Sequence, residues 1–438
     1  EIGFIVVSAP GTLPGFDRKM TDVLIDYGRS YIHSGENLGR LTEIIRGFED
    51  LYKDFELGQE RKHFHSMIRR YLAPSYSQLR GNGLDYFAAQ GEWFSARYFA
   101  GMIGGRVLNT AIRFDANGQV DRTETAAGIL RQREMLMSES MAVVIPGFYG
   151  FYPDGVIGTL GRGGSDRTQA IYGAELGWHC ENWTDKDGIH STDPEIYLSE
   201  GEPDRTVVIG TLGRDELREG AHGGSGVLQG DTVIDLNGSD VVVTVKNTFN
   251  PSAPGTRVVP QLSQEELEER GERSVVAVSG RSDLVQVGLR DLGMAEREGY
   301  VNELLAFLAE QNLPFEHMPA AQDSVAFTMH ANQDDERVLA FEEFARSHRL
   351  SQQGRVALEA AGVVYVVGER LRDRNRFDRE EVIARCLSLA VSEGIHVTPV
   401  VGSNMRNVAS PSIAFLTERE KVTELVKAIH SAEIESAE

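Results

Sequence analysis

The residues best suited to chemistry lie in a glycine-rich stretch at positions 159–166, Thr-Leu-Gly-Arg-Gly-Gly-Ser-Asp, between a predicted strand and a predicted helix. Glycines allow the backbone to approach a ligand closely, and N–H groups at the start of a helix attract anions. Arg162 offers a planar guanidinium that can bind a carboxylate or a phosphate. A plain β-turn has a similar composition, so this stretch predicts an anion site only together with other motifs.

A polar loop follows a second predicted strand, at positions 181–194, Glu-Asn-Trp-Thr-Asp-Lys-Asp-Gly-Ile-His-Ser-Thr-Asp-Pro. Ligands of open α/β sheets bind beyond the carboxyl ends of strands, so Thr184 and Asp185 are well placed to contact a nucleotide. A group of Asx-turns that only closes the loop is the alternative interpretation.

Hydrophobic patterning places both stretches in an α/β domain. Apolar runs ended by glycine or proline indicate buried parallel strands, which we expect at residues 2–9, 140–149, 178–183, 206–209 and 241–246. Residues 87–101 have helical periodicity without proline, and a second helical pattern follows Ser165. Strands that alternate with helices up to residue 259 predict a three-layer α/β/α domain with a mostly parallel sheet.

The composition changes at residues 263–272, a charged stretch that is typical of a linker. After it, a strand and helix order occurs twice, and both copies contain Ser-(Val or Ile)-Ala-Phe, at 324–327 and 412–415. The first copy opens with a strand at 274–279 or at 284–289, and the pattern does not decide between them. We expect two ferredoxin-like βαββαβ modules, with two unrelated α/β hairpins as the alternative. The predicted domains are residues 1–262, 274–350 and 351–438.

The overall composition excludes several classes of protein. The 438 residues are 41% hydrophobic and include two cysteines, which favours a cytoplasmic multidomain protein without a disulfide framework. We expect no membrane partner, because no run of about 18 apolar residues could cross a bilayer. A net charge of −22 argues against nucleic-acid binding. His63 and His65 lack further ligands at metal-site spacing, so we expect no zinc.

Taken together, the motifs resemble those of the aspartate kinase members of the amino acid kinase family. The resemblance begins with 147–166 and 183–194 and extends in register to 6–11 (Val-Val-Ser-Ala-Pro-Gly), 20–22 (Met-Thr-Asp), 90–92 (Gln-Gly-Glu) and 246–256. The C-terminal repeat resembles the paired ACT modules of the same enzymes. The resemblance implies ATP-dependent phosphorylation of the side-chain carboxylate of L-aspartate, with Mg²⁺, as the first step of lysine, threonine and methionine biosynthesis.

The resemblance also implies roles for individual residues. Arg162 would pair with a substrate carboxylate, Glu92 would hold the α-amino group, and Thr21 would complete the aspartate site. Asp166 would organise the site near the transferred phosphoryl group, so Arg162 and Asp166 are the expected catalytic residues. The nucleotide would contact Gly163, Gly164, Thr184, Asp185 and His190. Phosphoryl transfer depends mainly on positioning and charge neutralisation, so no covalent nucleophile is expected.

Two departures from the family bear on activity. The family begins with a Lys-Phe-Gly-Gly strand whose lysine bridges the phosphates, and a second lysine, in Gly-Ala-Lys-Val-Leu-His, is replaced around residues 220–229. Because a sheet without its first strand would expose a hydrophobic edge, we expect further residues before Glu1. The alternative is a catalytically degenerate paralogue that binds amino acids as a regulatory subunit. A kinase with another acceptor, such as glutamate, is disfavoured by the sensing modules.

The C-terminal modules imply allosteric control by lysine or threonine. In the family the effector binds where two ACT modules meet, at positions that correspond here to Met294, Gly299, Tyr300, Val301, Phe315 and Glu316. Glu316 could pair with the effector's ammonium group, or could be an exposed strand residue without such a role. Residues 319–321, Pro-Ala-Ala, replace the Ser or Thr of lysine-sensitive relatives. Paired ACT sheets also imply a homodimer or homotetramer.

Overall fold

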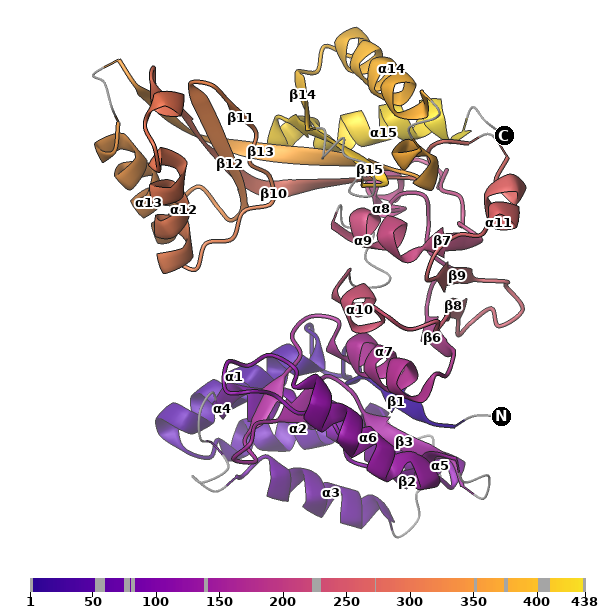
Figure 1. Cartoon of the computed structure of the whole chain (residues 1–438). Coiled ribbons are helices and arrows are strands. Elements are labelled where there is room, and N and C mark those ends of the chain that lie inside the picture. The colour runs from indigo at the N-terminus through magenta and orange to yellow at the C-terminus, as the bar shows by residue number, and fades with distance from the viewer. Residues whose placement is uncertain are drawn as a thin grey trace. The chain divides into compact units, whose positions relative to one another are not determined.

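The computed structural model describes residues 3–51, 60–74, 79, 83–137, 141–222, 230–271, 273–349, 353–373, 377–400 and 410–435. The chain forms two compact units (Figure 1). Unit 1 comprises Glu1–Asn182 and Asp231–Val243, and unit 2 comprises Trp183–Gly230 and Thr244–Glu438. The predicted domain of residues 1–262 is therefore divided between the two units.

Unit 1 has a small parallel sheet surrounded by helices. Its elements are β1 (Ile5–Val7), α1 (Met20–Ser34), α2 (Leu38–Leu51), α3 (Glu60–Tyr71), α4 (Gly83–Ala88), α5 (Gln90–Ile103), β2 (Arg106–Val107), α6 (Arg122–Leu136), β3 (Val143–Pro146), β4 (Tyr149–Phe151), β5 (Ile157–Thr159), α7 (Gly164–Leu176) and α10 (Gly230–Asp235). The sheet order is β1-β3-β2, and β3 pairs with both neighbours in parallel.

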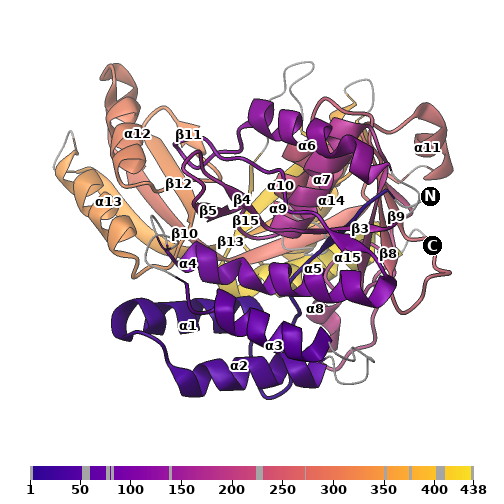
Figure 2. The ribbon, with the colours of Figure 1, turned by 90° about the horizontal axis from the view of Figure 1, so that it is seen from below.

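Helices cover both faces of this sheet because β3 presents apolar side chains to both faces. Val144 packs against Ala96 and Ala100 of α5. Val143 and Ile145 pack on the other side, in a core that α6 and α7 complete. The predicted three-layer α/β/α arrangement with parallel strands is confirmed. A further apolar core joins α1 to α5, and Figure 2 shows α1, α2 and α3 beside α5.

Unit 2 begins with the segment after the second motif and continues through the C-terminal half of the chain. Its elements are β6 (Cys180–Thr184, which starts in unit 1), α8 (Glu195–Leu198), β7 (Thr211–Gly213), α9 (Arg214–His222), β8 (Val243–Asn247), β9 (Thr256–Val259), α11 (Gln264–Glu269), β10 (Ala277–Arg290), α12 (Tyr300–Glu310), β11 (Ala320–Ala321), β12 (Ser324–His330), α13 (Glu336–Ser347), β13 (Arg355–Val367), α14 (Asp378–Ser392), β14 (Val397–Val400), β15 (Ser412–Thr417) and α15 (Val422–Glu433).

A four-stranded sheet in the order β6-β8-β9-β7 follows unit 1 in the chain. It confirms the strands predicted at 178–183 and 241–246. The strand predicted at 206–209 is wrong, because in that range only Val208 forms an isolated bridge, with His190. The predicted linker contains the short helix α11, which begins with a reciprocal hydrogen-bonded cap between Ser263 and Glu266.

The C-terminal repeat folds into one antiparallel sheet in the order β11-β12-β10-β13-β15-β14. The long strands β10 and β13 pair along nearly their whole length, and a bulge in β10 lies between Arg281 and Leu284. The two strand positions that the sequence left open, 274–279 and 284–289, thus belong largely to one continuous strand. The repeated order of strands and helices that the sequence indicated is observed in both halves of this region.

The two modules exchange strand halves across this bulge. One core contains Val285 and Val287 of β10 with Val356 of β13 and helices α12 and α13. The other contains Val278 of β10 with Val364 of β13 and helices α14 and α15. Each module therefore has the βαββαβ composition, but each takes one strand half from the sequence segment that was predicted to form the other.

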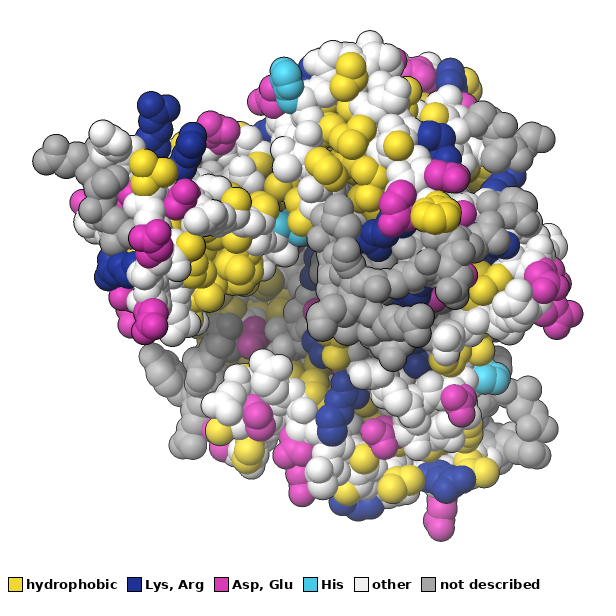
Figure 3. All heavy atoms as spheres, turned by 45° about the horizontal axis from the view of Figure 1, so that its top comes forward, with side chains coloured by type: hydrophobic (Ala, Val, Ile, Leu, Met, Phe, Trp, Pro, Cys, Tyr) yellow, Lys and Arg dark blue, Asp and Glu magenta, His cyan; other side chains and the backbone are white. Residues whose placement is uncertain are grey.

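The distribution of charged side chains and the character of the helices agree with the charged, moderately hydrophobic composition. On the face shown in Figure 3, Asp and Glu side chains are interspersed with Lys and Arg and do not gather into one continuous patch. Within the described ranges, no helix combines the length and the apolar character that a membrane span requires.

The strand exchange depends on a close approach at Gly362, which gives a first prediction. A Cβ at Gly362 would lie 2.1 Å from Cγ2 of Val422 and 3.1 Å from the Arg281 carbonyl oxygen. We expect Gly362→Ala to destabilise unit 2 by about 1–3 kcal/mol, as overpacking does. Gly288→Ala, in the same sheet and with open space around the added Cβ, is the control. Calorimetric melting checks both variants, and equal melting temperatures would contradict the proposed packing constraint.

Candidate active site

Glu92 is a buried carboxylate at the start of α5. Its side chain is held against the end of β1, because Gly91 lets the two segments approach: a Cβ at Gly91 would lie 2.7 Å from the Cβ of Ala9. Glu92 is only 4% exposed, and its Oε2 has no hydrogen-bond partner among the described residues. Burial raises the pKa of Glu92 to about 8, against the lowering effect of backbone N–H groups at Glu92 and Ala9. Such an orphaned carboxylate fits a cationic ligand.

The glycine-rich turn leads directly into α7. Gly163 is the N-cap of this helix and has φ of 71°, a left-handed conformation that favours glycine. Arg162 lies on the exposed part of the turn. Gly147, after β3, packs so closely that an added Cβ would lie 2.8 Å from Cα of Ser165. The turn is thus fixed beside the end of β3, with the helix N-terminus available to an anion.

The segments that carry Glu92 and Arg162 meet the carboxyl ends of β1 and β3, and the segment after β1 also contacts the start of α1, which carries Thr21. The Gly147 N–H donates to the Val7 carbonyl at 3.0 Å, which joins the carboxyl ends of β3 and β1. Gly91, next to Glu92, packs against Ala9 after β1. The glycine-rich turn that carries Arg162 leads to Ser165, which packs against Gly147 after β3. Thr21 is half-buried in the first turn of α1, beside Met20, whose N–H donates to the Gly11 carbonyl at 2.8 Å.

Asp166 lies in the first turn of α7, where the helix dipole favours a negative charge. Its Oδ1 accepts a hydrogen bond of 2.9 Å from Nδ2 of Asn182. Burial nevertheless raises the pKa of this carboxyl. Asp166 is therefore a partly desolvated acid next to the glycine-rich turn, and a carboxylate is a ligand that suits a divalent cation.

Comparison with known proteins identifies the family. Residues 31–247 match the model described as "Amino acid kinase family". A relative from Bacillus subtilis, "Aspartokinase 3", is 27% identical over 84% of this chain and 80% of its own length. The part of the chain that this model covers, residues 31–247, belongs to the amino acid kinase family. "Aspartokinase 1, chloroplastic" from Arabidopsis thaliana is 23% identical over 100% of this chain and 76% of its own length.

Solved structures of aspartate kinases share the fold of this chain. The enzyme from Clostridium acetobutylicum has a TM-score of 0.75 at 21% identity, over 98% of this chain and 92% of its own. Aspartokinase III from E. coli, solved with aspartate and ADP, has a TM-score of 0.70 at 20% identity and the same coverage. The predicted fold class is therefore confirmed, including the paired C-terminal modules.

Three of the predicted nucleotide residues, Thr184 at the end of β6 and Asp185 and His190 after it, lie in unit 2. Thr184 donates its hydroxyl to Asp185 at 3.2 Å, and its carbonyl accepts from the Thr248 N–H at 2.8 Å. His190 is hydrogen bonded through Nδ1 to Thr206 at 2.6 Å, and burial lowers its pKa. These contacts fix the ends of the loop and leave its polar groups next to the end of a strand.

The same loop is anchored to the last helix of the C-terminal repeat. His430 of α15 is fully buried, and its Nε2 lies 2.8 Å from the Ser191 hydroxyl, one residue after His190. Its Nδ1 lies 3.0 Å from the Tyr197 hydroxyl. Burial lowers the pKa of His430, so a neutral imidazole joins the two hydroxyls. A displacement of α15 would therefore also displace Ser191 and Tyr197, which are hydrogen bonded to His430.

The predicted effector residues differ in their surroundings. Met294 and Tyr300 are buried in the core of the first module, and Val301 packs against it. Phe315 is 39% exposed. Glu316 is ion-paired with Arg281 at 2.8 Å and accepts from the Tyr365 hydroxyl at 3.3 Å. The predicted strand at Phe315 and Glu316 is wrong, because this segment contributes only an isolated bridge at His317.

Two further residues of the site were missed by sequence reasoning. Phe148, after Gly147, has φ of 76°, which is uncommon for a residue other than glycine and often marks a functional turn. Its N–H donates to the Thr168 hydroxyl of α7 at 3.1 Å. The side chain of Asp235 is fully buried and forms ion pairs with Arg167 at 2.7 Å and with Arg122 at 2.5 Å. Local sequence gives no signal for this ion triad, because its members are more than 40 residues apart.

Asp235 positions the glycine-rich turn, which gives a second prediction. It orients Arg167, whose Nη1 donates to the Leu160 carbonyl at 3.0 Å. Asp235→Asn should leave a buried guanidinium uncompensated and destabilise unit 1 by about 3–5 kcal/mol. Arg122→Gln is the control, since Arg122 is 43% exposed and should cost about 1 kcal/mol or less. Thermal denaturation checks both, and equal effects would contradict the role of the Asp235–Arg167 pair.

Proposed function

We propose that this chain is an aspartate kinase that transfers the γ-phosphoryl group of ATP to the side-chain carboxylate of L-aspartate. The observation that carries the proposal is Glu92, a buried carboxylate with an unpartnered oxygen beside an anion-binding turn. A buried carboxyl group that an ammonium ion would bring into its ionised form, together with the guanidinium of Arg162, is suited to a zwitterionic substrate that carries a further carboxylate. The aspartokinase relatives described above agree with this substrate.

In the proposed complex, Glu92 binds the α-ammonium group of aspartate. Arg162 pairs with a substrate carboxylate, and Thr21 contributes its hydroxyl from the first turn of α1. These contacts hold the other carboxylate as the nucleophile for an in-line displacement. The acceptor oxygen forms its bond to the γ-phosphorus as the bond to the β,γ-bridging oxygen of ATP breaks, which releases ADP.

The nucleotide is proposed to bind with its phosphates at Gly163 and Gly164 and to contact Thr184, Asp185 and His190. ADP in the E. coli structure supports this class of cosubstrate. Asp166 is the carboxylate that would hold Mg²⁺, which supplies charge neutralisation on the phosphates when bound. The residues that replace the second family lysine, at 223–229, lie outside the described part of the chain.

The third prediction concerns Glu92 and aspartate binding. Glu92→Gln keeps the shape of the side chain but removes the negative partner of the ammonium group. We expect KM for aspartate to rise about 10- to 100-fold, the usual cost of losing a hydrogen bond between charged groups, whereas KM for ATP should stay unchanged. Glu134→Gln, on the exposed surface of α6, is the control. Steady-state kinetics that show equal effects on both substrates would contradict this role.

Glu92 also gives a pH-dependent readout that needs no catalysis. Its pKa is about 8 in the folded chain, against an ordinary value of 4.5. As the pH rises, the unfolded chain therefore loses the Glu92 proton at a lower pH than the folded chain does. The contribution of Glu92 to the free energy of unfolding falls between pH 4.5 and about 8. Without ligand, Glu92→Gln should melt above the parent at pH 9 and close to it at pH 4.5. If Glu92→Gln melted below the parent at pH 9, the inference that Glu92 is a buried carboxylate without a full set of partners would be contradicted.

A coupled assay separates this function from that of a degenerate paralogue. Aspartate, ATP and Mg²⁺ with hydroxylamine should give aspartyl hydroxamate together with ADP, because the product is an acyl phosphate. Glutamate in place of aspartate is the specificity control. ATP-independent binding of amino acids without hydroxamate would favour the paralogue that acts as a regulatory subunit.

We further propose that residues 1–262 form the catalytic domain and that 274–350 and 351–438 form two ACT modules with exchanged strand halves. A homodimer or homotetramer is proposed from the paired sheets, and the proposed location is the cytoplasm. The effector is lysine or threonine, bound near Gly299, Tyr300 and Val301 with Met294 and Phe315. "Aspartokinase III" of E. coli, which was solved with lysine and aspartate, supports an amino-acid effector.

The fourth prediction tests this effector site. For Glu316 to bind an ammonium group, it must exchange its contact with Arg281, and Glu316→Gln should weaken binding about tenfold. Calorimetric titration with L-lysine and L-threonine measures the affinity, and the D-enantiomers are the control. No heat with either L-amino acid, or equal binding by Glu316→Gln, would contradict the assignment.

A further inference from the structure

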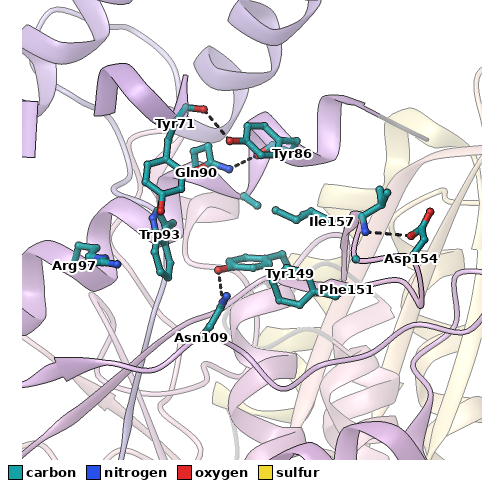
Figure 4. A pocket seen from close by; sticks show the side chains of 13 residues that line it. Tyr71, Tyr86, Gln90, Trp93, Arg97, Asn109, Tyr149, Phe151, Asp154 and Ile157 are labelled. Atoms are coloured by element: carbon teal, nitrogen blue, oxygen red, sulfur yellow. Dashed lines mark hydrogen bonds between the residues drawn. The ribbon is translucent and has the colours of Figure 1, made fainter. Parts of the chain in front are cut away.

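Unit 1 contains a cavity of about 630 Å³ that the proposed reaction does not use. Figure 4 shows its walls: Tyr71 of α3 and Tyr86 of α4 lie on the helical side, and Tyr149 and Phe151 of β4 lie on the other. The residues proposed to bind aspartate, Thr21, Glu92 and Arg162, do not line it. Its volume falls in the range of sites for small organic ligands.

Two buried polar atoms in the walls lack partners. Gln90 is 3% exposed and donates through Nε2 to the Tyr86 carbonyl at 2.7 Å, but its Oε1 has no hydrogen-bond partner among the described residues. Trp93 Nε1 is likewise buried and unpartnered within the described part of the chain. Buried polar atoms are nearly always hydrogen bonded in native proteins. One acceptor and one donor therefore remain available to a ligand in this cavity.

Aromatic rings and a guanidinium complete the site. The rings of Tyr71 and Trp93 lie 5.9 Å apart, and those of Tyr149 and Phe151 lie 5.8 Å apart. Arg97 is exposed, with its guanidinium carbon 4.7 Å from the centre of the Trp93 ring. No ion pair of Arg97 occurs among the described residues, so its charge is available at the rim of the cavity.

The cavity lies on a different side of α5 from the aspartate site. Gln90, Trp93 and Arg97 are spaced three and four residues apart, which places them on one face of the helix. Glu92 points instead toward Ala9 at the end of β1. Tyr149 is close enough to Glu92 that the carboxylate, together with burial as the larger cause, raises the pKa of its phenol. A ligand in the cavity would thus contact the same helix that holds Glu92.

We propose that this cavity is a second ligand site of unit 1, for a small ring-bearing carboxylate that also carries a hydrogen-bond donor. The ring packs among the aromatic side chains. The carboxylate faces Arg97 and the Trp93 indole N–H, and the donor binds Oε1 of Gln90.

Three probes test the proposed ligand class by calorimetric titration of the full chain. L-phenylalanine has a ring, a carboxylate and a donor, whereas 3-phenylpropanoate lacks the donor and 2-phenylethylamine lacks the carboxylate. L-phenylalanine should bind, and each truncated probe should bind about tenfold more weakly, the usual loss for one charge-assisted hydrogen bond. No heat from any probe at about 10 mM, or tighter binding of the amine than of L-phenylalanine, would overturn the proposal.

Variants locate the probe. Arg97→Gln and Trp93→Phe should each weaken L-phenylalanine binding about fivefold or more, whereas Arg46→Gln, an exposed charge change on α2, should not. The indole N–H signal that disappears in Trp93→Phe, one of three in the chain, should shift on titration in nuclear magnetic resonance spectra. Glu92→Gln should retain probe binding. Loss of binding in Glu92→Gln would place the probe in the aspartate site and overturn the proposal, without bearing on the kinase assay.

Discussion

The structure depends on the cost of keeping the Glu92 carboxylate out of water without a full set of partners. A charge in such a place interacts strongly with any group that reaches it, because the local dielectric constant is low. The surrounding residues serve to keep that place dry and fixed. Gly91 brings α5 against the end of β1, and Ala96 and Ala100 let the same helix lie close to Val144. Small residues of this helix thus determine where the charge lies.

The second half of the site is fixed by hydrogen bonds rather than by apolar packing. Arg167 joins the buried Asp235 to the carbonyl at the start of the glycine-rich turn, and Thr168 holds the strained Phe148. The loop after β6 is fixed in unit 2 by Thr206, Thr248 and His430. In each unit, hydrogen bonds thus hold a polar segment of the backbone in place, which suits a reaction that depends mainly on positioning and charge.

Much of the fold could be predicted from the sequence, because the apolar patterns of β3, α7 and the C-terminal helices are regular. The strand predicted at 206–209 was wrong because its run of apolar residues, Val-Val-Ile, pairs with no neighbouring strand and only Val208 forms an isolated bridge. The site motifs were visible since glycine, arginine and acidic residues occur together. Asp235, Arg167 and the aromatic cavity could not be found, because they depend on contacts between segments far apart in the chain. The sequence showed that Glu316 is an acidic residue that could bind an ammonium group, but it could not show that Glu316 is ion-paired with Arg281.

The exchange of strand halves between the C-terminal modules has a consequence for synthesis on the ribosome. The core with α12 and α13 can close once β13 has emerged, since all its strands precede that point. The other core must wait, because residues near Val278 find their partners only when α15, at the end of the chain, has been made. The earliest segment of this region is thus the last to be enclosed, and it remains accessible to chaperones or to a second nascent chain in the meantime.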